Sequence, residues 1–226
     1  MAFYHYPEST SVNRIIAKEK IYEQAKISSE IKQLFVNEIK EIRWRNKLAE
    51  NTLNLKADDT LKEIQVLQIT LKGEHFSLEC LKAIDKAIPS PIIFEVHSVA
   101  QIGVWATHKK LNQKGTGMLV GDHYFNKTLP KGEVERKPLP TSISLTVLYK
   151  GIFTALMPDE IVAKASKEEG APTIEALLAH DEMARKLLSE IERVEKRVIR
   201  ERQFNRKVAL NRELKLLKER YHALLN

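Results

Sequence analysis

The sequence has one cysteine, few glycines and no long apolar run. Cys80 alone cannot form an intrachain disulfide, which suits a reducing compartment. No stretch approaches the roughly 18 apolar residues of a membrane-spanning helix. The first ten residues have neither the basic region nor the apolar region of a signal peptide. These absences predict a cytoplasmic protein without a membrane partner.

Motifs for cofactor and metal chemistry are also missing. The glycines at 115, 117 and 121 lack the spacing of a dinucleotide-binding loop and predict a hairpin turn, and there is no Walker motif. The seven histidines form no HxH or HExxH pair, and Cys80 has no CxxC partner. We therefore predict no cofactor, no metal site and no catalytic residue.

A metal-dependent nuclease is the enzyme class for which a partial pattern exists. Such enzymes hold metal ions with carboxylates, commonly an Asp and then a strand with Glu and Lys one residue apart. Asp58 or Asp59 precedes Glu63 here, but Gln65 stands where the lysine is needed. The residues to test are Asp59, Glu63 and Lys72, although Lys72 lies far along the strand. A nuclease is kept as an alternative only.

Basic residues outnumber acidic ones by 37 to 30, which gives a net charge of +7 and a pI near 9.3. This mild excess favours an anionic partner such as nucleic acid but equally suits ordinary solubility. The length of 226 residues fits one domain with an extension, or two small domains, and 43% apolar residues suffice for a core.

Apolar patterns predict a compact α+β domain of mixed sheet and helices over residues 1–157. Helical spacing covers 27–44, 77–88 and 141–158, with Ser28 or Ser29, Ser77, and Thr141 or Ser142 as the respective N-caps. Strands are predicted over 13–24, 61–72, 91–96, 102–110 and 117–125. Residues 127–141 are polar and proline-rich, which predicts a loop.

Residues 158–171 are predicted to be a polar linker, and 172–226 a C-terminal helical arm, because no glycine and no further proline follow Pro172. One heptad register fits Leu187, Ile191, Val194 and Val198, and a different one fits Leu210, Leu214, Leu217, Tyr221 and Leu224. A break near 200–209 would give two antiparallel helices. A straight coiled coil with an 11-residue repeat is the alternative. Either stripe needs a partner: a second copy, the protein's own core or another protein.

The segment RERQFNRKVALNRELKLLKER, residues 200–220, lies where the registers conflict. Three interpretations stay open: a solvated helix face, a nucleic-acid surface, and a protein-docking surface with Phe204 as its anchor. The predicted phosphate contacts are Arg197, Arg200, Arg202, Arg206 and Lys207. The predicted partner-binding residues are Gln203, Phe204, Asn205, Asn211, Leu210, Leu214, Leu217 and Tyr221. Trp44, between two arginines, is predicted to close a helix end rather than to stack on a base.

The first 19 residues of this segment resemble the closing signature of a bacterial family known as domain of unknown function 4391. Four earlier motifs agree in order: RIIAKEKIYE at 14–23, and the segments 28–55, 62–72 and 81–96. Ala17 stands where the family's first motif has proline. The resemblance implies genes beside helicases and adenine methyltransferases of restriction-like loci. It provides no catalytic residue to carry over.

We therefore predict a non-catalytic accessory subunit of a bacterial anti-phage defence or restriction–modification complex. It docks on a helicase or DNA methyltransferase encoded nearby and contacts DNA through the basic helix. The alternatives are a stand-alone DNA-binding module, a metal-dependent nuclease subunit, and self-association through the arm.

Overall fold

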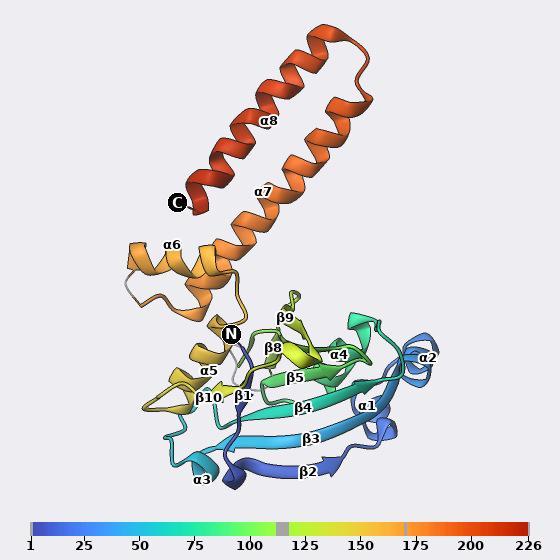
Figure 1. Ribbon diagram of the computed structural model, residues 1–226, viewed down its shortest axis with the longest axis vertical. Helices are drawn as coiled ribbons and strands as arrows, with labels where there is room; N and C mark the ends of the chain where they lie inside the picture. Colours follow the sequence, from blue (N-terminus) through green and yellow to red (C-terminus); the bar gives the residue numbers. More distant parts are fainter. Residues whose placement is uncertain (1, 112–117, 170, 226) are drawn as a thin grey trace. The chain divides into compact units, whose positions relative to one another are not determined.

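The computed structural model describes residues 2–111, 118–169 and 171–225. The chain forms two compact units, Met1–Leu156 and Met157–Asn226 (Figure 1). The first combines a mixed sheet with helices and the second is helical, which confirms the predicted α+β class with a long C-terminal helical segment. Among the described residues, no helix is both long enough and apolar enough to cross a membrane.

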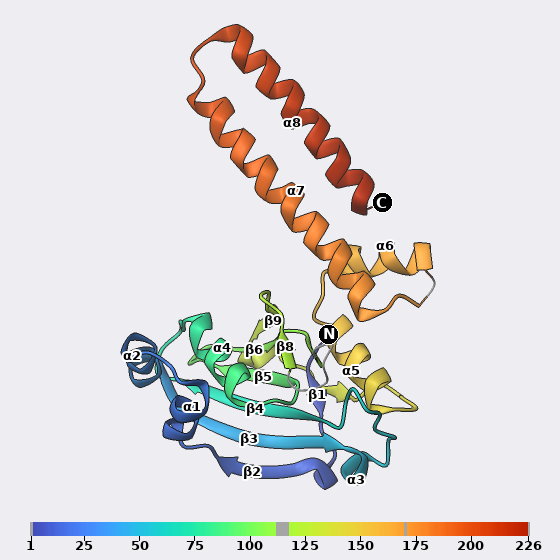
Figure 2. The same cartoon turned by 180° about the vertical axis from the view of Figure 1, so that it is seen from behind.

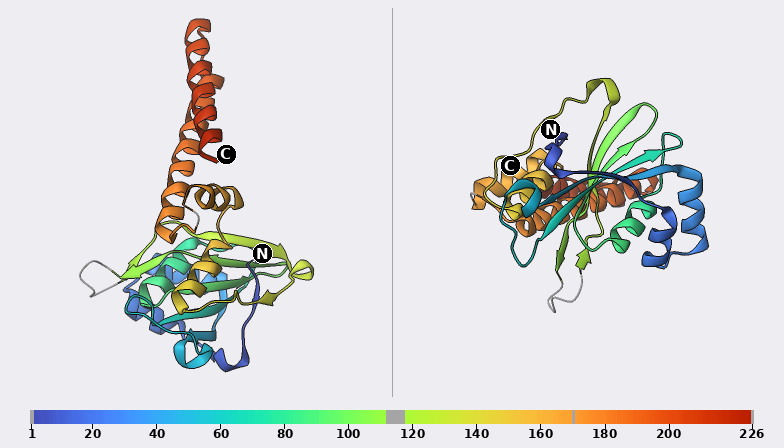
Figure 3. Two further views of the ribbon diagram at one scale, coloured as in Figure 1. Left: turned by 90° about the vertical axis from the view of Figure 1, so that its left-hand side faces the viewer. Right: turned by 90° about the horizontal axis from the view of Figure 1, so that it is seen from below.

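The first unit is built on a six-stranded sheet in the order β2-β3-β4-β5-β6-β9. Its strands are β2 (Ser11–Ile15), β3 (Ile39–Ala49), β4 (Glu63–Leu71), β5 (Ile92–His97), β6 (Gln101–Ala106) and β9 (Phe125–Pro130). β4 and β5 are parallel and are joined by a crossover helix, α4 (Leu78–Ala87), while every other neighbouring pair is antiparallel. The strands fan out with the usual sheet twist in the right-hand view of Figure 3.

Helices cover one face of this sheet. They are α4, α1 (Lys18–Ala25) and α2 (Ser29–Glu38), which lie together in Figure 2. Alternate residues of β4, Leu67, Ile69 and Leu71, point into the core on this face, because side chains alternate along a strand. The Ser77 hydroxyl accepts a hydrogen bond from the Glu79 N–H and caps α4 as predicted.

Short elements complete the unit. Two further pairs of strands form, β1 (Tyr4–His5) with β10 (Lys137–Pro138) and β7 (Lys109–Leu111) with β8 (Met118–Val120). The remaining helices are η1 (Glu8–Thr10), α3 (Glu50–Leu53), η2 (Lys131–Glu133) and α5 (Leu145–Thr154). Most of the hairpin turn predicted from the glycines falls in 112–117, outside the described residues.

The helix predicted over 27–44 is too long. It ends at Glu38, and residues 39–49 form β3 instead. Ile39 and Ile42 mimic helical spacing because a register irregularity between Ile39 and Glu41 brings both side chains to the core face of the strand. Trp44 therefore lies on a strand and not at a helix end.

Other predicted boundaries also shift. The strand predicted over 13–24 is β2 followed by α1, and the strand predicted over 117–125 is β8 and the start of β9, which runs on into the predicted loop. The N-cap of α5 is Ser144, whose hydroxyl accepts a hydrogen bond from the Val147 N–H, rather than Thr141 or Ser142.

The second unit contains α6 (Asp159–Glu169), α7 (Ile174–Arg200) and α8 (Phe204–Leu225). Residues 158–171, predicted as a linker, thus hold a helix. Ile161 and Ala165, four residues apart, are buried on one face of α6, which contacts α7. The polar composition belongs to the solvated face of the helix.

Candidate functional site

The helices α7 and α8 form an antiparallel hairpin (Figures 1 and 2). Their apolar stripes meet in one cluster, in which Ile191, Val194, Leu210 and Leu217 are buried and Leu187, Val198, Leu214 and Tyr221 pack around them. Ion pairs cross the hairpin from Lys218 Nζ to Glu195 Oε1 at 2.7 Å and from Arg197 Nη1 to Glu213 Oε1 at 3.8 Å. The two conflicting heptad registers therefore face each other, and the straight-helix alternative is wrong.

The apolar residues predicted to bind a partner lie inside this hairpin. Leu210 and Leu217 are buried against α7, and Leu214 and Tyr221 pack beside them. Heptad spacing indicates that an apolar stripe packs against another helix, but it does not indicate whether that helix belongs to the same chain. These four residues contact the protein's own chain.

The turn of the hairpin is different, and we call residues 199–207 the hairpin tip. Phe204 and Ile199 are both 79% exposed. The Glu201 carboxylate accepts a hydrogen bond from the Gln203 N–H at 2.8 Å, which stabilises the turn. The Lys207 N–H donates to the Gln203 carbonyl at 2.9 Å and closes the first turn of α8. The tip is thus an ordered turn with apolar side chains in solvent.

The hairpin tip is rich in cations that are exposed to solvent. Within the residues that the structure describes, no ion pair involves the four exposed cations Arg200, Arg202, Arg206 and Lys207. Arg197, also predicted as a phosphate contact, differs because Glu213 lies beside it. Gln203, Asn205 and Asn211 are exposed. The structure therefore gathers most of the predicted polar contacts at one end of the hairpin.

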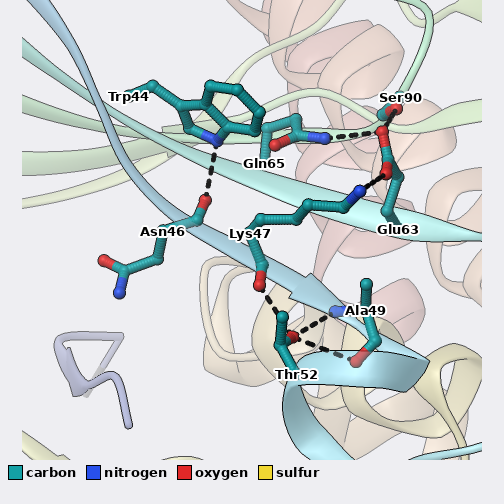
Figure 4. A network of polar contacts seen from close by, with 8 residues as sticks. All are labelled: Trp44, Asn46, Lys47, Ala49, Thr52, Glu63, Gln65 and Ser90. Atoms are coloured by element: carbon teal, nitrogen blue, oxygen red, sulfur yellow. Dashed lines mark hydrogen bonds and ion pairs between the residues drawn. The ribbon is translucent and has the colours of Figure 1, made fainter. Parts of the chain in front are cut away.

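The residues proposed for a nuclease do not meet. Glu63 begins β4 and accepts hydrogen bonds from Ser90 Oγ and Gln65 Nε2 at 2.9 and 2.8 Å (Figure 4). Lys47 Nζ lies 2.7 Å from its other oxygen. Asp59 pairs with Lys62 on the surface, and Lys72, just past the far end of β4, donates to the Val36 carbonyl.

Burial tends to raise the pKa of Glu63, but the contacts with Lys47, Ser90 and Gln65 outweigh it and lower that pKa. The carboxylate thus links β3 and β4 to the segment that precedes β5, at one end of the sheet. Nearer the middle of β3, Trp44 Nε1 donates to the Asn46 carbonyl (Figure 4). In the described part of the chain, no three His, Cys, Asp or Glu side chains are grouped so that they could hold a metal ion.

The sequence patterns did not predict a second polar site, around Glu95. This residue lies in β5 within the apolar run IIFEV and is buried. Its two oxygens each lie 2.7 Å from a guanidinium nitrogen of Arg136. A charged residue in an otherwise apolar central strand was the available signal, because such a residue is rarely buried without a partner. The partner, 41 positions away, could not be read from it.

The fold and the hairpin tip define a class: an α+β protein with a helical hairpin that presents unneutralised cations and an exposed aromatic at its turn. Residues 5–220 match a family model described as Domain of unknown function (DUF4391), and the chain therefore belongs to this family. The match includes the hairpin tip and confirms the resemblance seen in the motifs. Neither the curated proteins nor the solved structures contained a match.

Proposed function

We propose that this protein is a non-catalytic accessory subunit of a bacterial anti-phage defence or restriction-like complex in the cytoplasm. In this proposal it docks on a helicase or DNA methyltransferase and contacts DNA through the hairpin tip. The observation that supports the proposal most is the hairpin tip itself, with its four unneutralised cations beside exposed Phe204 and Ile199.

The two kinds of side chain at the tip favour two kinds of contact. Moving Phe204 from solvent into a partner's pocket would contribute about 2 kcal/mol, as for other large apolar side chains. Arginine and an aromatic residue together are typical of the few residues that dominate protein interfaces. The cations can release counterions from phosphates, which adds affinity that does not depend on sequence.

The strength of the DNA contact favours a subunit over a stand-alone DNA-binding module. Four phosphate contacts would give a slope of about −3.6 in a plot of log affinity against log salt. Non-specific binding of this kind typically has a dissociation constant of about 10⁻⁴ to 10⁻⁶ M at physiological salt. A tip of this size therefore holds DNA well only when a partner enzyme already keeps the DNA close.

Affinity purification of the tagged protein from its native host, at moderate salt and with nuclease treatment, tests the proposal. We expect a helicase or DNA methyltransferase in stoichiometric amount. Phe204→Ala should reduce its recovery. Leu216→Ala, which truncates another exposed apolar residue of α8, should not. Recovery of the protein alone, or of DNA alone before nuclease treatment, would contradict the docking role.

A further inference from the structure

A polar cavity of about 380 Å³ opens in the first unit. Its floor includes Val66 and Gln68 of β4, which alternate with the core residues Leu67 and Ile69 and so point to the face opposite α1, α2 and α4. The N-terminal segment from Tyr4 to Ser11 lines one side. We call this space the sheet-face cavity.

Planar polar side chains from three adjacent strands line the sheet-face cavity. Gln68 lies opposite Glu95 in the β4–β5 ladder, and Arg45 Nη1 donates to Gln68 Oε1 at 3.0 Å. Arg136 also lines it and donates to both oxygens of Glu95. These groups satisfy one another, but buried polar pairs seldom stabilise a fold more than apolar packing does, so their grouping around an open space points to a ligand.

One polar atom of a lining residue, the Tyr6 hydroxyl, is closed to solvent and has no hydrogen-bond partner in the described chain. His97 Nε2 is closed to solvent too, but it lies 3.6 Å from Glu95 Oε2. Burial, and then the charge of Glu95, raise the pKa of Tyr6 well above its usual value, so the hydroxyl stays a neutral donor. A buried donor without an acceptor costs free energy, which a ligand acceptor recovers by taking the place of the groups that cover the Tyr6 hydroxyl.

We propose that the sheet-face cavity binds a nucleobase. The lining offers an amide, guanidinium groups and a carboxylate, which are the side-chain types that read base edges. Tyr6 and His97, which are both partly exposed, add rings against which a base can stack. The volume lies within the range of small-molecule sites.

The charges of the cavity favour an uncharged ring over other ligands. An anionic group entering it would meet Glu95, whose pKa is lowered to about 2 because the contacts with Arg136 and His97 outweigh its burial. A cationic group would meet Arg45 and Arg136. The base could belong to a free nucleoside or be extruded from a single strand, as enzymes that act on bases achieve by flipping.

Calorimetric titration of the full chain with each of the four deoxynucleosides tests the proposal. We expect saturable binding of at least one. Tyr6→Phe and Gln68→Leu should each weaken it about tenfold, since each removes one hydrogen-bonding group. Tyr22→Phe removes the same atom from α1, outside the cavity lining, and should leave the affinity unchanged. Melting curves confirm that the variants fold.

A second titration separates the two sources of the base. It uses single-stranded DNA of the preferred base, and the same strand without bases, in a protein carrying Arg200→Gln, Arg202→Gln and Arg206→Gln. If only the strand with bases binds, and Tyr6→Phe weakens that binding, the base comes from a strand. This holds even if free nucleosides bind weakly. No binding in either titration, or binding that Tyr6→Phe and Gln68→Leu leave unchanged, overturns the proposal. The inference rests on residues of the first unit alone and does not depend on the function proposed for the hairpin tip.

Discussion

The buried ion pair of Lys109 and Asp85 provides a sharp test of how the first unit is held together. Lys109 Nζ lies 2.7 Å from Asp85 Oδ1 and donates to the Ile88 and Ser90 carbonyls at 2.7 and 3.0 Å. The Tyr124 hydroxyl donates to the other Asp85 oxygen. The two charged side chains are 0% and 1% exposed. The cluster therefore ties the end of α4 to the start of β7.

Removing one member should be far more costly than removing both. Lys109→Met leaves a buried carboxylate without its cation, which costs about 3 to 5 kcal/mol. Asp85→Leu leaves a buried ammonium and should cost a similar amount. The double variant leaves neither charge, so its cost should fall at least 2 kcal/mol below the sum of the single costs.

Urea unfolding followed by tryptophan fluorescence measures these costs. Both tryptophans, Trp44 and Trp105, lie in the first unit, so the signal reports that unit. Lys82→Met is the matched control, because Lys82 pairs with Glu79 on the exposed side of α4 and should change the stability by less than 1 kcal/mol. A cost below 1 kcal/mol for Lys109→Met, or additive costs in the double variant, would refute the reasoning.

Three further predictions concern Glu95, the hairpin tip and the hairpin core. The lowered pKa of Glu95, from its usual 4.5 to about 2, stabilises the fold by about 3 kcal/mol at neutral pH. That contribution is present above pH 4.5 and is lost as the pH falls towards 2, so urea midpoints of the wild type and Glu95→Gln should converge over this range. Changing Arg200, Arg202 and Arg206 to Gln should lower the salt slope of DNA binding by about 3 in fluorescence anisotropy. Changing the paired cations Lys186, Lys215 and Lys218 to Gln removes the same charge but should leave the salt slope unchanged. Leu210→Ala and Leu217→Ala should each destabilise the hairpin by about 2 to 5 kcal/mol, measured by circular dichroism. The molecular mass measured by light scattering should not change. Conversion of a dimer to a monomer would contradict the assignment of these residues to the core of the hairpin.

The parts of the fold that the sequence predicted well are those in which local pattern and burial agree. β4 is rich in Ile, Val and Leu, α4 has regular helical spacing with a capping serine, and the structure places both within two residues of the prediction. The prediction for β3 was wrong because the register irregularity at Ile39 gives the apolar residues of this strand the spacing of a helix. A bulge depends on pairing with a neighbouring strand, which no local pattern contains.

The candidate site shows the same division. The conflict between heptad registers located the turn of the hairpin within residues 200–209, and the turn lies at 201–203. Whether a cation is free could not be predicted, because Arg197 and its partner Glu213 meet only after the chain reverses. Glu95 and Arg136 meet through the sheet and the segment that follows β9, so their pairing was invisible for the same reason.

The distribution of pairing along the hairpin also decides what the net charge of the protein means. Along its body, cations alternate with acids that neutralise them, as in the pairs of Lys186 with Glu182 and Lys218 with Glu195. Residues 200–207 hold four cations and one acid, and that acid accepts a backbone hydrogen bond. Nearly half of the net charge of +7 is therefore concentrated at one turn. Charge that served only solubility would be spread over the surface. The three tip arginines have no ion-pair partner among the described residues, whereas the three lysines have one each, and comparing their salt slopes separates a binding surface from a solvated one.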